Sequence, residues 1–288
     1  MGDWLKFILG TVQLGLQYGV NNKVGKPSLQ TSLDLLRQAR NLGVASLDTS
    51  DLYGSSPEVI CQFGAAEFKV LSKFSLENKA QFVNVLDTSL SRLGASHLHC
   101  YSFHRFSDFE NFKDWEAVKK AKEEKKIELV GVSVYSNEQL RRAAEESHID
   151  VIQSPFNLLD NYRLRGEFFE IAKHNKKQIH VRSIYLQGLM LMRPEDLAGA
   201  TAKLRPAIQK LREIAKKSGL SMQQLCFSYV NSFSNIDAVV VGVETAEQLE
   251  QSFELSECPE LDSSVLSEIH SIDLQDTEIL NPSTWSRT

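Results

Sequence analysis

Two side chains that could take part in acid–base chemistry lie close together in the stretch LDTSDLYG (47–54). An aspartate, Asp48, ends a short apolar run, and a phenol, Tyr53, follows it by five residues. An ammonium, Lys73, stands in the otherwise apolar VLSKF (70–74), and an imidazole, His104, ends YSFH (101–104). A phenol has a pKa of about 10, and a neighbouring ammonium lowers that pKa by stabilising the phenolate.

If these residues meet, Tyr53 is a candidate general acid. Lys73 would lower the pKa of Tyr53, and Asp48 would hold Lys73 in place. His104 would donate a hydrogen bond to a substrate oxygen and orient it. Asp51 has no role in this scheme, and we expect it to face solvent or to cap the following helix.

Each of the four residues also has an ordinary structural interpretation. Asp48 could cap a helix, and Tyr53 could be a packed surface aromatic. Lys73 could pair with a surface carboxylate, and His104 could be a hydrogen-bonded core histidine. The functional interpretation therefore depends on whether the fold brings all four to one place.

Short apolar runs alternate with longer helical patterns along the whole chain. Strands are predicted at 6–12, 44–50, 69–74, 98–104, 129–135, 151–157, 179–185 and 238–243. Helices are predicted at 28–43, after Pro57, and at 77–94, 108–126, 137–147, 164–175, 203–218, 221–232 and 245–255. Such alternation implies parallel strand pairing.

Eight strand–helix units in 288 residues have the number and size of a (β/α)8 TIM barrel. We predict a single α/β domain over residues 1–288, with a C-terminal tail at 276–288. An open doubly wound sheet is the alternative, but no GxGxxG motif follows any predicted strand. In a barrel the active site lies at the carboxyl ends of the strands. Asp48, Lys73, His104, Ser133, Gln153 and Arg182 would all meet there.

The composition excludes several classes of protein. The net charge is −5 and the basic residues are scattered, which argues against nucleic-acid binding. No apolar run reaches the ~18 residues of a membrane span. The four cysteines form no CxxC pair, and the first ten residues lack the features of a secretion signal, so we expect a cytoplasmic protein.

A metal-dependent hydrolase is a further alternative, because His97 and His99 form an HxH motif. Both residues open the fourth predicted strand and fall at the closed end of the barrel. His104 lies at the opposite end. No acid-and-histidine set completes a zinc site, so no metal is expected.

The sequence resembles the aldo-keto reductase superfamily over nearly its whole length, and in particular the bacterial-type members. The resemblance lies in LDTSDLYG, LSKF and YSFHR, which supply Asp48, Tyr53, Lys73 and His104 in order. It extends to GVS (131–133), VIQSPFN (151–157), LQGLM (186–190), GVETAEQLEQS (242–252) and NPSTW (281–285). It implies an NAD(P)H-dependent oxidoreductase that reduces an aldehyde or ketone, with those four residues as the catalytic tetrad.

The resemblance also implies a cofactor site, with NADP(H) or NAD(H) as cofactor. The implied cofactor-binding residues are Gly10, Thr11, Val12, Asp48, Ser133, Gln153, Arg182, Ser183, Tyr185, Gln187, Gly188, Gly242, Val243, Glu244, Thr245, Gln248 and Ser252. Substrate specificity is expected in the loops 105–114 and 186–200 and in the tail after 276. The alternative function is a non-catalytic, cofactor-binding regulatory subunit of the same fold.

Two departures from the family pattern affect the cofactor. Arg182 stands where many members stack a tyrosine on the nicotinamide, and it could instead meet an acidic substrate; a shifted register would make Tyr185 the stacking residue. At the adenosine end, residues 242–252 contain no basic residue to bind a 2′-phosphate. The sequence therefore predicts weak discrimination against NADH.

Overall fold

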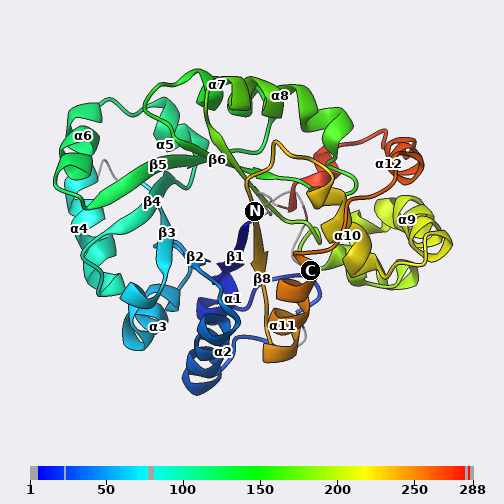
Figure 1. Cartoon of the computed structure of the whole chain (residues 1–288), viewed down its shortest axis with the longest axis horizontal. Coiled ribbons are helices and arrows are strands. Elements are labelled where there is room, and N and C mark those ends of the chain that lie inside the picture. Colours follow the sequence, from blue (N-terminus) through cyan, green and yellow to red (C-terminus); the bar gives the residue numbers. More distant parts are fainter. Residues whose placement is uncertain (1–5, 23, 77–80, 283–284, 286–288) are drawn as a thin grey trace.

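Eight parallel strands close into a barrel in the computed structural model, which describes residues 6–22, 24–76, 81–282 and 285 (Figure 1). Each strand pairs with its neighbours in the sequence, and the eighth pairs with the first. The strands are β1 (Lys6–Gly10), β2 (Ser46–Asp48), β3 (Lys69–Phe74), β4 (Leu98–Phe103), β5 (Ile127–Ser133), β6 (Val151–Pro155), β7 (Gln178–Arg182) and β8 (Ala238–Gly242). The predicted (β/α)8 barrel is confirmed.

The helices surround the barrel (Figure 1). They are α1 (Val12–Gly15), α2 (Leu29–Leu42), α3 (Ser56–Phe63), α4 (Phe82–Leu93), α5 (Phe106–Glu110), α6 (Trp115–Glu123), α7 (Asn137–Glu145), α8 (Tyr162–His174), α9 (Arg205–Lys217), α10 (Met222–Asn231), α11 (Ala246–Leu255) and α12 (Ser263–His270). Helix α12 lies beside α9 (Figure 1). Short 3-10 turns lie at Ala65–Glu67, Leu189–Leu191, Pro194–Asp196, Gly199–Leu204 and Glu278–Leu280. Among the described residues, none of these helices has the length and apolar character needed to cross a membrane.

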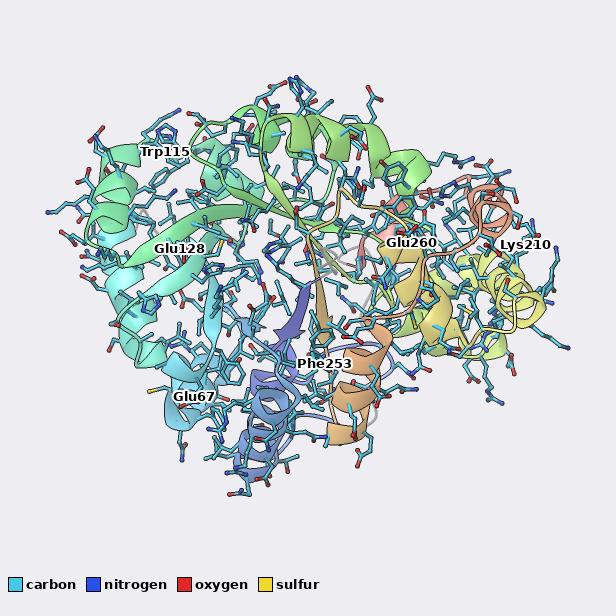
Figure 2. All side chains as sticks on the ribbon, in the orientation of Figure 1. Glu67, Trp115, Glu128, Lys210, Phe253 and Glu260 are labelled. Atoms are coloured by element: carbon cyan, nitrogen blue, oxygen red, sulfur yellow. The ribbon has the colours of Figure 1, made fainter. Side chains whose placement is uncertain are left out.

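Two apolar layers hold this arrangement together. Alternate residues of each strand face opposite sides of the sheet, so Phe7 and Leu9 pack outward against the helices while Ile8 faces the barrel interior. The ring of Phe7 meets that of Phe253 on α11 at 5.7 Å, and Phe253 is labelled in Figure 2. Figure 2 also shows Glu67 and Lys210 on the outer side of the helical layer, where both are exposed.

The apolar layer in the barrel interior determines where along the barrel axis the polar side chains lie. Its apolar side chains are Ile8, Leu71, Cys100, Val151, Ala238 and Val240. Lys73 is two residues beyond Leu71 on β3, and therefore faces the same side one layer higher. Leu47 packs outward, so its neighbour Asp48 faces inward. Register then places Asp48 beside Gly10, and Ser133 beside Gln153.

Several predicted boundaries are wrong, most of them at strand ends. The first strand stops at Gly10 rather than 12, because the chain turns into α1. The seventh stops at Arg182 rather than 185, because Ser183 has a φ of 63° and begins a loop. The fifth is shifted to 127–133, and His104 directly follows β4 instead of ending it.

The predicted helix 108–126 is two helices, α5 and α6. Between them the ring of Phe112 turns into the core and packs 5.0 Å from that of Phe103. The side chain of Asp114 then accepts a hydrogen bond from the Ala117 amide at 3.3 Å and starts α6. The helix α12 has no counterpart among the predicted elements. The start of the predicted helix at 77–80, and part of NPSTW, lie outside the described residues.

Candidate active site

A cavity of about 410 Å³ opens at the carboxyl ends of the strands. This is the size of an ordinary small-molecule site, and a barrel carries its active site at this end. The structure brings Asp48, Tyr53, Lys73 and His104 together in its wall. The predicted cofactor residues that also line it are Gly10, Thr11, Val12, Ser133, Gln153, Arg182, Ser183, Tyr185, Gln187, Gly188, Gly242, Val243, Glu244, Gln248 and Ser252.

A buried ion pair lies at the floor of the cavity. The ammonium of Lys73 donates to one carboxylate oxygen of Asp48, and the two side chains are 3% and 5% exposed. The amide of Gln153 donates to the other carboxylate oxygen at 2.8 Å. Asp48 is thus neither exposed nor a helix cap. A buried charge needs such partners, because leaving water costs each ion several kcal/mol.

The loop that carries Tyr53 is fixed on both sides. The Thr11 hydroxyl donates to the Asp48 carbonyl at 3.0 Å, and the Ser56 hydroxyl donates to Thr11 at 2.8 Å. The backbone of Gly15 lies so close that a Cβ there would stand 1.8 Å from the Tyr53 carbonyl oxygen. Because no side chain fits at Gly15, the backbone of α1 packs directly against the turn that carries Tyr53.

Tyr53 and His104 are neighbours in the cavity wall beside the ion pair. Their ring centroids are 5.8 Å apart in an edge-to-face arrangement. The Lys73 ammonium lies 5.2 Å from the centroid of the Tyr53 ring. The phenol of Tyr53, the imidazole of His104 and the ammonium of Lys73, which is paired with Asp48, therefore lie together in the cavity wall.

The pKa of Tyr53 is raised in this structure, not lowered as expected. Burial raises the pKa of the Tyr53 phenol well above its usual value, and the Asp48 carboxylate raises it further. The physical reason is that burial removes the water that would stabilise a phenolate, and the nearby Asp48 carboxylate repels its negative charge. Tyr53 therefore keeps its proton at neutral pH.

His104 is neutral at physiological pH. Burial, together with the ammonium of Lys73, lowers the pKa of this imidazole to about 3. Its Nδ1 lies 2.8 Å from the Ser50 hydroxyl, which also lies 3.1 Å from the Lys73 carbonyl and accepts the Leu52 amide. Ser50 thus ties the imidazole to the loop between β2 and α3.

Asp51 does not face solvent or cap a helix as expected. Its carboxylate accepts a hydrogen bond of 2.6 Å from the Ser89 hydroxyl on α4. Burial raises the pKa of Asp51. The guanidinium of Arg92 donates to the Asp51 carbonyl at 2.9 Å. Asp51 therefore anchors the back of the Tyr53 loop to α4.

The loop after β7 has an unusual backbone where it borders the cavity. Ser183, Leu186 and Gln187 have φ values of 63°, 48° and 55°, a region that non-glycine residues rarely adopt. Gly188 follows with φ 88°, and a Cβ on it would lie 2.8 Å from that of Asn21. Backbone strain of this kind is common at functional sites.

The segment after α1 reaches over to this loop. The Gln187 amide donates to the Tyr18 hydroxyl at 3.0 Å, and the Val20 amide donates to the Gln187 carbonyl at 3.2 Å. The chain around 18–21 thus forms one side of the cavity, opposite the end of β6.

Arg182 and Tyr185 both line the cavity but in different ways. The guanidinium of Arg182 stacks over the ring of Tyr135, 4.4 Å from its centroid. The ring of Tyr185 packs edge-on against Phe227 at 6.0 Å, and burial raises the pKa of its hydroxyl. The predicted residue and its alternative therefore both border the same space.

The far end of the cavity is formed by β8 and the start of α11. The Gln248 side-chain oxygen accepts the Glu244 amide at 2.8 Å, and burial raises the pKa of the Glu244 carboxyl. Thr245 is the one predicted cofactor residue outside the cavity wall; its hydroxyl caps α11 by accepting the Gln248 amide at 3.2 Å.

Several lining residues were not predicted from the sequence. They are Gln13, Tyr18, Gly19, Asn21, Tyr135, Ile184, Leu191, Gln223, Val240, Val241 and Gln251. Most lie in loops or on helices without a motif. The exception is Gln13, which directly follows the recognised Thr11 and Val12. A Cβ added at Gly242 would lie 2.3 Å from the side-chain oxygen of Gln13 and would clash with it.

The HxH motif does not form a metal site. His99 pairs with Glu128 at 2.7 Å at the start of β4, and His97 precedes that strand. Over the described ranges, no group of three or more potential ligands is close enough to hold a metal ion.

The chain matches the model of the aldo/keto reductase family over residues 6–274. It is 23% identical to L-glyceraldehyde 3-phosphate reductase of Escherichia coli O157:H7, over 78% of each chain. It is 30% identical to aldo-keto reductase yakc [NADP(+)] of Schizosaccharomyces pombe, over 49% of this chain and 48% of that protein. A solved structure from Pseudomonas aeruginosa, itself assigned to the aldo-keto reductases, matches the fold with a TM-score of 0.64 at 22% identity, covering 88% of this chain and 90% of that one.

The low pKa of His104 predicts a specific loss of stability in acid. The folded state keeps the imidazole neutral, whereas the unfolded chain takes up a proton below its pKa of about 6.5. Stability should therefore fall as the pH drops from 6.5 towards 3. Relative to His104→Asn, the wild type should lose up to about 2 kcal/mol of unfolding free energy between pH 7 and pH 5.

Urea unfolding of both proteins at the two pH values measures this difference. Other titrating groups, such as the buried His180, are present in both proteins and cancel. A wild-type-to-variant difference that is the same at pH 7 and pH 5 would contradict the assignment.

Proposed function

This chain belongs to the aldo/keto reductase family of NAD(P)H-dependent oxidoreductases, and we propose that it reduces an aldehyde or ketone to the alcohol with Tyr53 as the proton donor. The observation that carries the proposal is the meeting of Tyr53, His104 and the Lys73–Asp48 pair in one cavity wall. The alternative, a non-catalytic regulatory subunit, would not need a buried ion pair beside a phenol and an imidazole.

The cavity wall fits a nicotinamide cofactor. Two buried polar atoms that line it have no hydrogen-bond partner among the described residues: the side-chain oxygens of Gln13 and Gln153. Buried polar atoms normally have partners, so these atoms favour a polar ligand. We assign Gln153 and Ser133 to the carboxamide, and the loop at Gln187–Gly188 to the pyrophosphate. When bound, the cofactor supplies the hydride.

The protein's own groups then handle the carbonyl oxygen. As the oxygen gains negative charge, Tyr53 transfers its proton to it, because an alkoxide is a much stronger base than a phenolate. The raised pKa of Tyr53 keeps that proton in place until it is needed. Lys73, 5.2 Å from the ring centre, is placed to stabilise the phenolate that remains until solvent returns a proton.

His104 positions the carbonyl oxygen as a neutral donor. This role requires the tautomer with the proton on Nε2, in which the Ser50 hydroxyl donates to Nδ1 instead of to the Lys73 carbonyl 3.1 Å away. A neutral imidazole polarises the carbonyl without competing with Tyr53 as the acid. The low pKa of His104 supports this role, since the ring does not gain a second proton at working pH.

The first prediction is that Tyr53→Phe lowers kcat by about 10²–10⁴-fold, the usual contribution of a positioned acid. Binding of NAD(P)H, followed by quenching of protein fluorescence, should stay nearly unchanged because the ring remains. Tyr162→Phe removes a hydroxyl on α8 that bonds to Glu170, outside the cavity, and should keep full activity. A Tyr53→Phe enzyme with more than about a tenth of wild-type kcat would show that another group donates the proton. A wild type without turnover on a panel of aldehydes would favour the regulatory subunit.

A second prediction concerns the choice of cofactor. The only basic side chains in the described cavity wall are Lys73, which Asp48 neutralises, and Arg182, and both lie at the catalytic end. The far end offers Glu244 and amides, which suit a ribose 2′-hydroxyl and repel a 2′-phosphate. Arg193 does not line the cavity and is paired with Asp196 at 2.8 Å. We infer use of NADH at least as efficient as that of NADPH.

The test is kcat/KM for NADH and NADPH with one aldehyde, in wild type and Gln248→Arg. The arginine should shift the ratio towards NADPH by about tenfold or more, through a charge-assisted hydrogen bond. Gln209→Arg, on the exposed face of α9, adds the same charge outside the cavity and should leave the ratio unchanged. Strong NADPH selectivity in the wild type that survives Gln248→Arg would place the phosphate elsewhere.

A further inference from the structure

Arg182 is a cation in the cavity wall without a counter-ion. It ends β7 and is partly buried, yet no carboxylate among the described residues pairs with it. Lys73, the other cation of the wall, is neutralised by Asp48, and the neutral His104 and Tyr53 add no charge. The catalytic end of the cavity therefore carries one net positive charge. A partly desolvated charge without a partner is costly, which favours an anionic ligand.

The hydrogen bonds of the guanidinium leave it free to bind such a ligand. Its contacts to the hydroxyls of Ser133 and Ser183 and to the Val134 carbonyl are all 3.4 Å long, and all three partners are uncharged. Guanidinium groups bind carboxylate and phosphate through two parallel bonds at shorter distances. These weak contacts position the guanidinium of Arg182, and an anionic ligand can replace them.

The support beneath Arg182 is rigid. Its guanidinium lies over the Tyr135 ring at 4.4 Å. The Tyr135 carbonyl accepts a hydrogen bond of 2.7 Å from Arg165, which in turn makes two bonds to the buried carboxylate of Asp160, at 2.7 and 2.8 Å. Two buried charges thus fix the loop that carries the stacking ring. A cation held in this way is preorganised for binding, which lowers the entropy cost of recognition.

Arg182 also shares the catalytic space. Its charge acts on both Tyr53 and His104, lowering the pKa of each. An anion bound to it would share the cavity with the two residues that meet the carbonyl oxygen in the proposed reduction. We propose that Arg182 binds a carboxylate or phosphate group of the substrate, so that the enzyme acts on anionic carbonyl compounds. This inference rests on the proposed carbonyl reduction and adds the substrate class.

The test uses pairs of aldehydes that differ in charge. 4-Carboxybenzaldehyde is compared with its neutral methyl ester, methyl 4-formylbenzoate, and glyceraldehyde 3-phosphate with glyceraldehyde. In the wild type, kcat/KM should favour the anion of at least one pair by tenfold or more. Arg182→Gln should reduce that preference at least tenfold, mainly through the KM of the anion, because the ion pair exists before the transition state. Arg182→Lys should retain part of it.

The two pairs of aldehydes identify the anion. A preference within the first pair indicates a carboxylate, and a preference within the second pair indicates a phosphate. Arg37→Gln removes an equal charge from the outer face of α2 and controls for long-range attraction. Equal kcat/KM for charged and neutral members of both pairs in the wild type would overturn the inference. So would an unchanged preference in Arg182→Gln, and weaker cofactor binding in that variant would then assign Arg182 to the cofactor. In either case, reduction of the ester that depends on Tyr53 would leave the proposed function standing.

Discussion

The buried ion pair between Lys73 and Asp48 is the interaction on which the site depends. It joins β2 to β3 inside the barrel, and the Gln153 amide extends it to β6. Neither charge could stand alone at this depth, since an unpaired buried ion costs several kcal/mol. Each residue therefore requires the other, and the carboxyl ends of three strands are held in one geometry. The loop that presents Tyr53 begins directly at this carboxylate.

The same pair determines the protonation of its neighbours. Burial, together with the negative charge of Asp48, keeps the proton on the phenol of Tyr53. The imidazole of His104 stays neutral because it is buried close to the ammonium. Tyr53 and His104, both uncharged, then border the catalytic end of the cavity, whose net charge comes from Arg182. Proton donation and charge recognition are thus assigned to different residues of one wall.

Much of this could be predicted from the sequence, because strand–helix alternation and the positions of polar residues at strand ends are local patterns. The barrel and the convergence of Asp48 with Lys73 follow from them. The raised pKa of Tyr53 does not, because it depends on how completely the fold buries the phenol and how close it lies to Asp48. The partner of Asp51 is a serine on a helix 38 residues away, which no local signal indicates. Tyr135, the support of Arg182, lies after β5 in a loop without a recognisable motif.

The most direct test of the central role of the ion pair is a double-mutant cycle of Asp48→Asn and Lys73→Met on the free energy of unfolding. Each single variant leaves one buried charge without its partner and should lose about 3–5 kcal/mol. The double variant buries neither charge, so it should be more stable than the sum of the two losses predicts, by at least about 2 kcal/mol. Additive losses in the double variant would show that the two charges do not depend on each other, and would contradict this account.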